Sequence, residues 1–319
     1  MWAGLLSGAR PTLFHDRPHN LCQSRGRSEI VSQFLLSVIS GIASGAVYGL
    51  IGLGLVIIYQ ATDVVHFGMA SMATAALYVA STMQARGFGG YGALLVAVGV
   101  AVLAGLIVRE VLIRPLGSGQ VFAALVVTMG LALILDDLTQ RIWSGVPRSY
   151  PALVKGQMTI GGAPVQYQQL LTIGVAAAAM LAVSYLFRRT ALGSAMRAVA
   201  ESAGTAQLLG VRSQQIGRIA WGLGMALAVL GAGLFAPTVG LTIGGLQGIL
   251  FRALAGIFLG GLTSMYGAVV GGLLIGVLDN LAASYVSASF RDTFVFAIAI
   301  LVLLVRPQGI FGRRTFQRV

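Results

Sequence analysis

The chain has 319 residues, of which 57% are hydrophobic and only 9% are charged, and its mean hydropathy is +0.87. Soluble domains carry about 25% charged residues, so this composition excludes an ordinary soluble protein and predicts an all-α, polytopic integral membrane protein. The net charge of +12 does not indicate a nucleic-acid-binding patch, because the basic residues lie between and beyond the apolar stretches, where they act as topology signals.

Residues that serve metal, cofactor or catalytic chemistry are scarce. Cys22 is the only cysteine and the three histidines are scattered, so we predict no disulfide, no metal site and no cofactor. The sequence contains no phosphate-binding loop, and the one lysine, Lys155, follows an apolar segment. A chain of this kind is not expected to be an enzyme, which leaves the classes of transporter, channel and scaffold.

The first 30 residues differ in composition from the rest. Residues 1–28 mix Pro, Arg and His with an apolar start that is too brief for the core of a signal peptide. They are predicted to be either a disordered arm or the product of a start codon assigned too early. A single transmembrane domain is predicted over residues 31–319.

Eight apolar segments follow, with a shorter ninth, and a membrane-spanning helix needs about 20 residues. The second and seventh are interrupted by His66 and Arg252, so they are candidates for re-entrant or broken helices, which must be surrounded by protein or water. The prediction is therefore about eight or nine transmembrane or re-entrant helices. The segments are 34–59, 64–83, 91–113, 121–143, 168–187, 219–240, 246–262, 266–288 and 292–305.

Arginine placement predicts the orientation of these segments. The loop at about 188–218 holds five arginines and one acid, so it is expected in the cytoplasm. Counting segments from it places the C-terminus and the end of the third segment on the same side, where further arginines lie. The same count leaves Arg10, Arg17, Arg25 and Arg27 outside, which conflicts with the rule that basic residues gather on the cytoplasmic side. Residues 144–167 face outward, and Gly161 and Gly162 favour a hairpin turn there, with a plain loop as the alternative.

Small residues recur at the spacing that lets helix backbones approach closely in lipid. This spacing predicts tight packing within the chain, and a subunit interface or a moving joint is the alternative. The residues are Ser37, Gly41, Gly45 and Gly49, and the pairs Gly256/Gly260, Gly267/Gly271 and Gly272/Gly276.

A few polar groups lie inside the apolar segments, where an ionisable group costs about 2.5–3.5 kcal/mol on insertion scales. Asp279 is the best candidate for a substrate-route residue. Asp136 is another, although Asp137 beside it points about 100° away around the helix, so only one of the two can face a route. Packing hydrogen bonds are the alternative for every one of these residues. The full set of candidates is Tyr48, His66, Thr128, Asp136, Asp279 and Asn280.

The loop "RRTALGSAMRAVAESAGTAQLLGV" (188–211) resembles the cytoplasmic coupling loop of the permease subunits of branched-chain amino acid ABC importers. That family has a basic R-x-G-x-x-x-R-A start and a short helix with an A-x-x-x-G core. Three other stretches resemble the same family in order, so the resemblance covers nearly everything from residue 31 to the end. These stretches are "IRPL" (113–116), "LGGLTSMYGAVVGGLLIG" (259–276) and "LVLLVRPQGIFGRR" (301–314).

The resemblance implies a permease in the bacterial cytoplasmic membrane that moves branched-chain amino acids, or a related small amino acid or amide, inward. ATP hydrolysis is expected on partner ATPases, which engage a helix at about 200–212. A second related permease and an extracytoplasmic solute-binding protein are the other expected partners. The residues implied in coupling are Arg189, Gly193, Arg197, Glu201, Ala203, Ala206 and Gly210.

Two departures from the family pattern leave the cargo open. "HFGMA" (66–70) keeps only Phe67 of the family's N-F-A-[HQ]-G-like stretch, and Thr263 stands where glycine is common. Three alternatives also stand. The loop residues could form a surface helix held to anionic membrane lipid. The chain could be an ion-coupled secondary transporter of a small polar solute that uses Asp63 and Asp279, or it could be a membrane scaffold.

Overall fold

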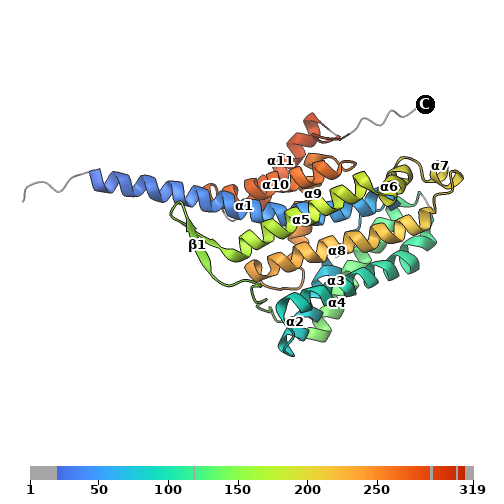
Figure 1. Ribbon diagram of the computed structural model, residues 1–319, viewed down its shortest axis with the longest axis horizontal. Coiled ribbons are helices and arrows are strands. Elements are labelled where there is room, and N and C mark those ends of the chain that lie inside the picture. Colours follow the sequence, from blue (N-terminus) through green and yellow to red (C-terminus); the bar gives the residue numbers. More distant parts are fainter. Residues whose placement is uncertain (1–19, 118, 288–289, 307, 313–319) are drawn as a thin grey trace, which may run out of the picture.

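The computed structural model describes residues 20–117, 119–287, 290–306 and 308–312, and it is a helical bundle with one small hairpin (Figure 1). Its elements, in chain order, are α1 (Asn20–Thr62), α2 (Met69–Ala85), α3 (Gly90–Val108), a π-helical turn (Arg109–Ile113) and a 3₁₀ turn (Arg114–Leu116), α4 (Val121–Trp143), β1 (Gln157–Ile160), β2 (Ala163–Gln166), α5 (Tyr167–Arg189), α6 (Ala191–Glu201), α7 (Ala203–Leu208), α8 (Ser213–Val239), α9 (Gly245–Gly260), α10 (Met265–Tyr285) and α11 (Arg291–Val305).

Every predicted apolar segment is a helix, which confirms an all-α polytopic membrane protein. Within the described residues, six helices are long and apolar enough to cross a membrane, and they belong to α1, α3, α4, α5, α8 and α10. Helices α2, α9 and α11 have 17, 16 and 15 residues. Most residues of α2 and α9 are buried, as short membrane helices require. The exact number of crossings stays a prediction.

Some predicted boundaries were wrong. Helix α8 begins at Ser213 rather than at 219, because its first polar turn continues the helix beyond the apolar stretch. Helix α2 begins at Met69, after a non-helical stretch that holds His66. Helix α1 begins at Asn20, inside the stretch predicted to be a disordered arm, and residues 1–19 of that stretch lie outside the described residues.

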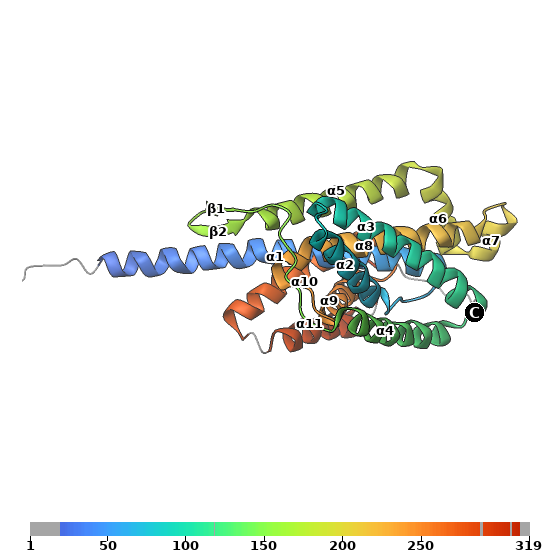
Figure 2. The ribbon, with the colours of Figure 1, turned by 90° about the horizontal axis from the view of Figure 1, so that it is seen from below.

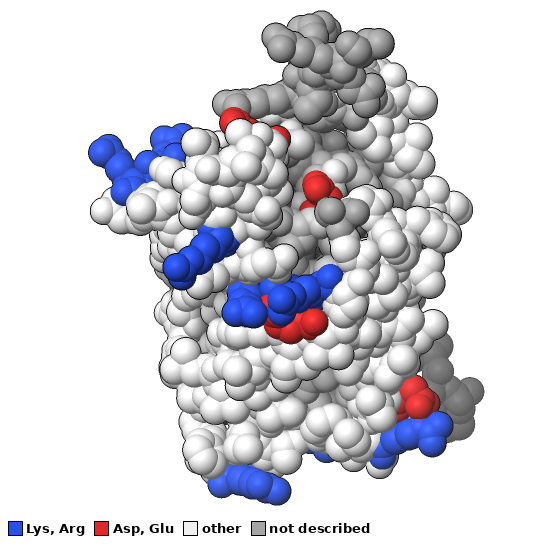
Figure 3. Space-filling model, turned by 90° about the vertical axis from the view of Figure 1, so that its right-hand side faces the viewer, with Lys and Arg blue, Asp and Glu red and all other residues white. Residues whose placement is uncertain are grey.

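The bundle has two distinct ends. The β1–β2 hairpin lies at one end and the short helices α6 and α7 lie at the other (Figures 1 and 2). Gly161 and Gly162 make the hairpin turn with φ of 59° and 83°, which confirms the predicted two-glycine turn. We call these the hairpin end and the loop end. Arginines are spread over the surface of the loop end, and acidic side chains lie beside some of them (Figure 3).

Contacts between glycine-lined helices form the centre of the fold. A methyl group added to Gly276 of α10 would lie 2.2 Å from the Cα of Gly45 in α1, and one on Gly256 of α9 would lie 2.9 Å from the Cα of Gly272. No side chain fits at such approaches. The small-residue spacing therefore does pack helices within the chain, as predicted.

This packing predicts a clear difference between two glycines. Replacing Gly276 by Ala should destabilise the protein by about 1–3 kcal/mol, because α10 must move away from α1. Gly174→Ala in α5 is the matched control, since no atom lies within 4 Å of an added methyl group there. Thermal unfolding in detergent measures both. Equal unfolding temperatures for the two variants would contradict the packing.

Candidate functional site

The loop end carries two short helices joined by well-defined caps. The Thr190 side chain accepts a hydrogen bond from the Gly193 amide at 3.1 Å and begins α6, and the Ser202 side chain accepts one from the Thr205 amide at 3.2 Å and begins α7. Gly210 then ends the turn with φ of +85°, a conformation that favours glycine. The single helix predicted over about 200–212 is thus a six-residue helix, separated from α6 by a break at Ser202.

Three of the predicted coupling residues hold the loop against the rest of the protein, and two of these are buried. A methyl group on Gly193 would lie 2.4 Å from the Cα of Phe187, and the Arg197 guanidinium donates to the Phe187 carbonyl. Both residues therefore hold α6 against the last turn of α5. Ala206 is 2% exposed and packs in the apolar cluster beneath α7. Gly193 and Ala206 are buried and do not belong to the outer surface of the loop, whereas Arg197 is exposed and is held by its hydrogen bond to the Phe187 carbonyl.

The remaining predicted coupling residues are exposed: Arg189, Glu201, Ala203 and Gly210. Two further exposed side chains of this loop were not predicted from the sequence. Leu208 is 90% exposed and Leu209 is 79% exposed at the end of α7, in a loop whose other exposed residues are polar or small. The signal was the pair of leucines directly before a glycine, and only the structure shows that neither turns inward.

A second polar feature at the loop end joins α3 to α8. Glu110 pairs with Arg114 and Arg218 at 2.9 Å each, and it also pairs with Arg109, whose guanidinium donates to Gln214 at 2.9 Å. The π-helical turn that starts at Arg109 places these groups together. Sequence analysis interpreted Arg109 and Arg114 as topology signals only, and the structure adds that they are fixed by ion pairs.

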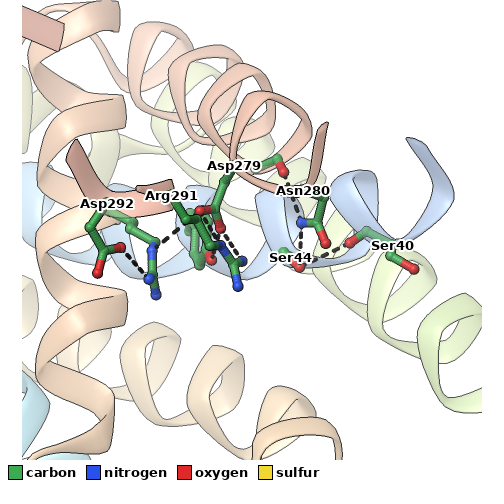
Figure 4. Close-up of polar contacts among 9 residues, drawn as sticks. Ser40, Ser44, Asp279, Asn280, Arg291 and Asp292 are labelled. Carbon is green, nitrogen blue, oxygen red and sulfur yellow. Dashed lines mark hydrogen bonds and ion pairs between the residues drawn. The ribbon is translucent and has the colours of Figure 1, made fainter. Parts of the chain in front are cut away.

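Inside the bundle, Asp279 lies in a network of charges that we call the charge network (Figure 4). Asp279 is fully buried; it accepts a hydrogen bond from the Tyr48 hydroxyl at 2.9 Å and pairs with both Nε and Nη2 of Arg291. The Arg252 Nε lies 3.5 Å from Asp279, and the same guanidinium pairs with Asp292. The positive charges of two arginines thus balance the negative charges of two carboxylates, which lowers the free-energy cost of burying Asp279.

The charge network connects four helices: Tyr48 belongs to α1, Arg252 to α9, Asp279 to α10, and Arg291 with Asp292 to α11. Asn280 does not join it. Its side-chain amide donates to the Ser44 hydroxyl at 3.2 Å and to the Gly276 carbonyl at 3.0 Å, on the side of α10 that meets α1 (Figure 4). The structure therefore brings Tyr48 and Asp279 together and places Asn280 in a helix contact.

Two other predicted route residues form a separate group around the start of α2. His66 is fully buried between the Met72 sulfur, 3.2 Å from its Nε2, and the Trp221 ring, 4.7 Å away. Thr128 is buried close by, since a methyl group on Gly68 would touch both the Thr128 carbonyl and the His66 ring. Asp136, two turns further along α4, has a buried carboxylate oxygen with no hydrogen bond among the described residues.

A cavity of about 250 Å³ lies between α2, α3 and α4. Its lining is apolar apart from Thr139 and Trp143, and it includes none of the predicted route residues. The Thr139 hydroxyl already donates to the Leu135 carbonyl at 2.6 Å. The cavity therefore offers little to a charged solute.

Comparison with known proteins identifies the class. The profile of the family "Branched-chain amino acid transport system / permease component" matches residues 37–304. The permease protein LivH of Escherichia coli is 30% identical over 308 residues, which cover 92% of this chain and 100% of that protein. BraD of Pseudomonas aeruginosa is 28% identical and covers 91% of this chain and 99% of BraD. Both carry the name of a high-affinity branched-chain amino acid transport system permease protein.

The chain is a multi-pass permease of the bacterial cytoplasmic membrane, and it belongs to the branched-chain amino acid transport system permease family. Among solved structures, a metal-chelate type ABC transporter in an inward-facing conformation is similar with a TM-score of 0.44 at 14% identity, covering 92% of this chain and 89% of that one. A similarity at that level is too remote to support any statement about this chain.

The charge network predicts an unequal response to two similar substitutions. Asp279→Asn removes the buried negative charge that pairs with the partly buried Arg291 guanidinium and should destabilise the protein by about 3–5 kcal/mol. Asp137→Asn is the control, because the Asp137–Arg141 ion pair is exposed on α4 and should contribute about 0–1 kcal/mol. Thermal unfolding in the same detergent compares them. Similar stability of the two variants would show that the buried pair contributes no more than the exposed one.

Proposed function

We propose that the chain is the membrane-spanning permease subunit of an ABC importer that moves branched-chain amino acids, or a related small amino acid or amide, into the cytoplasm. Partner ATPases hydrolyse ATP, a second related permease completes the pathway, and an extracytoplasmic binding protein delivers the substrate. The loop end faces the cytoplasm, which agrees with its arginines, and the hairpin end faces outward. The names of the relatives support the substrate class.

The exposure of Leu208 and Leu209 is the observation that carries this proposal. Both residues stand at the end of α7, and this helix lies at the far tip of the loop end (Figure 1). Two adjacent leucines so exposed in a polar loop are typical of a surface that a partner covers. A groove on an ATPase that receives both leucines would gain apolar contact at the point where α7 is farthest from the bundle.

The loop is built to transmit force. Helix α6 contacts α1, α5 and α8, and Arg197 and Gly193 fix it to the end of α5. Helix α7 follows after a capped break, with Ala206 buried beneath it. A movement of the ATPase at the leucines would therefore pass to the long helices as a rigid displacement. The exposed Arg189 and Glu201 can form ion pairs with charges on the partner.

The ion-coupled alternative has less support from these contacts. A coupling-ion site needs carboxylate oxygens that are free to bind the ion. Asp279 already accepts from Tyr48 and Arg291, and Asp63 is exposed at the end of α1 with φ of 55°. The two acids are therefore used differently and do not form one site.

A charge placed on the apolar tip tests the docking surface. Leu209→Asp should prevent the ATPase from co-purifying with the tagged permease, because the carboxylate would be buried in the partner's apolar groove. Gln215→Asp, an equally exposed change in the first turn of α8, is the matched control. Gentle solubilisation of native membranes followed by identification of bound proteins gives the readout. Full ATPase recovery with Leu209→Asp would reject α7 as the docking element.

A second test uses the glycine that ends α7. Gly210→Ala should strain the turn by about 1–2 kcal/mol and lower the amount of substrate imported per ATP hydrolysed, because φ of +85° is unfavourable for alanine. Gly204→Ala is the control, since Gly204 is exposed within helix α7 and an added methyl group meets no atom within 4 Å. Parallel uptake and ATPase assays in proteoliposomes measure the ratio. An unchanged ratio in Gly210→Ala would mean that coupling tolerates a distorted tip.

A further inference from the structure

The two carboxylates of the charge network differ in exposure. Asp279 is fully buried and receives hydrogen bonds from Tyr48 and Arg291. The Asp292 side chain is 64% exposed, and its hydrogen-bond partner in the described part of the chain is Arg252. An incoming anion could therefore displace Asp292 from its arginine, whereas Asp279 is held from several sides.

Arg252 has capacity for another partner. Its side chain is 16% exposed, and its Nε is buried without a hydrogen bond among the described residues, since the nearest Asp279 oxygen is 3.5 Å away. The buried Nε lies toward Asp279, and the Nη2 donor on the other side of the guanidinium is held by the exposed Asp292, so an incoming carboxylate would take the place of Asp292. A planar carboxylate is the group that a guanidinium with free donors binds best, because two parallel hydrogen bonds can form.

The depth of the Arg252–Asp292 ion pair in the bundle indicates what surrounds it. Asp279 lies six residues before the end of α10 at Tyr285, which corresponds to about 9 Å inside that end at about 1.5 Å per residue. An exposed carboxylate close to this depth is costly if it faces hydrocarbon, so this side of α9 and α11 is expected to border water or a polar cavity. Phe251 and Phe290, next to the pair in the sequence, are 40% and 64% exposed and offer apolar surface beside the charges.

We propose that Arg252 and Asp292 form an exchangeable ion pair that binds a zwitterionic α-amino acid, with the α-carboxylate on Arg252 and the α-ammonium on Asp292. The substrate brings one charge of each sign, so each member of the pair exchanges its partner for an equivalent one and the site stays neutral. Asp279 and Arg291 position Arg252 and α11 and do not exchange. This inference rests on the proposed function for the class of substrate.

The test uses the assembly that co-purifies with the tagged chain, reconstituted in lipid nanodiscs without its binding protein. Binding of radiolabelled L-leucine is measured by scintillation proximity. Arg252→Gln and Asp292→Asn should each weaken leucine binding at least about tenfold, because each removes the partner of one substrate charge. Asp137→Asn, which breaks the exposed Asp137–Arg141 pair on α4, should leave the affinity unchanged.

Two analogues separate the roles of the two residues. Isocaproate lacks the ammonium group of leucine, and leucinamide lacks its carboxylate. Asp292→Asn should abolish the preference for leucine over isocaproate, and Arg252→Gln should abolish the preference for leucine over leucinamide. A purely structural ion pair would lower thermal stability in both variants without changing either preference. Arg252→Lys keeps the positive charge and serves as the second variant if Arg252→Gln does not fold.

The outcomes distinguish this inference from the proposed function. Unchanged leucine affinity and unchanged preferences in folded variants overturn the inference, as does a wild-type assembly that contains the ATPase but shows no saturable leucine binding. Loss of the ATPase from every preparation, with the predicted pattern of leucine binding retained, rejects the ABC assignment and leaves the binding site in place.

Discussion

Close contact between the backbones of α1, α9 and α10 is the constraint on which the rest of the structure depends. Lipid gives helices no hydrophobic reason to associate, so they associate through packing at short distances and through polar contacts. Glycines supply the short distances here, as where Gly276 of α10 meets Gly45 of α1. Because these three helices cannot separate without losing that contact, they form a rigid centre to which the charge network and the coupling loop are attached.

The positions of the charged groups in the charge network depend on this rigid packing. Asp279 is at the face of α10 that the glycines bring against α1, and the Tyr48 hydroxyl reaches it from there. Arg252 and Arg291 arrive from α9 and α11, so that the short helix α11 is held by charge as well as by packing. A buried carboxylate with several donors is stable only when those donors stay in place. The glycine contacts keep the helices that carry them at the required distance.

The loop that holds α6 and α7, for which we propose the coupling role, is connected to the same centre by a different kind of contact. Helix α6 lies against α1 and the end of α5, so the loop is anchored on the helix that also contacts α10. The tip of α7 is not packed in this way, because the side chains of Leu208 and Leu209 are almost entirely exposed. A fold that is tightly packed at one point and open at another is suited to receive a partner at the tip and to move as a unit.

Much of this protein could be predicted from its sequence, because lipid imposes strong and local rules. Apolar length identified every long helix, glycine spacing identified the packed faces, Gly161 and Gly162 identified the hairpin, and the loop motif identified the family. Local patterns do not show which side chains meet across distant segments. Asp279 was a candidate from its place inside an apolar segment, yet its pairing with Arg291 and Arg252 could not be predicted, because it depends on how the separate helices α9, α10 and α11 pack together.

The same limit explains the coupling loop. Gly193 and Ala206 were expected to take part in coupling, but both face the interior, and the leucines that were not predicted face outward. Which side of a short helix is buried depends on where its neighbours lie, and six residues of α7 are too few to show a periodic pattern. The sequence by itself therefore determined the class of protein, its helices and its family. Only the tertiary structure decided which polar groups are paired, which are free to exchange, and which side chains the loop presents.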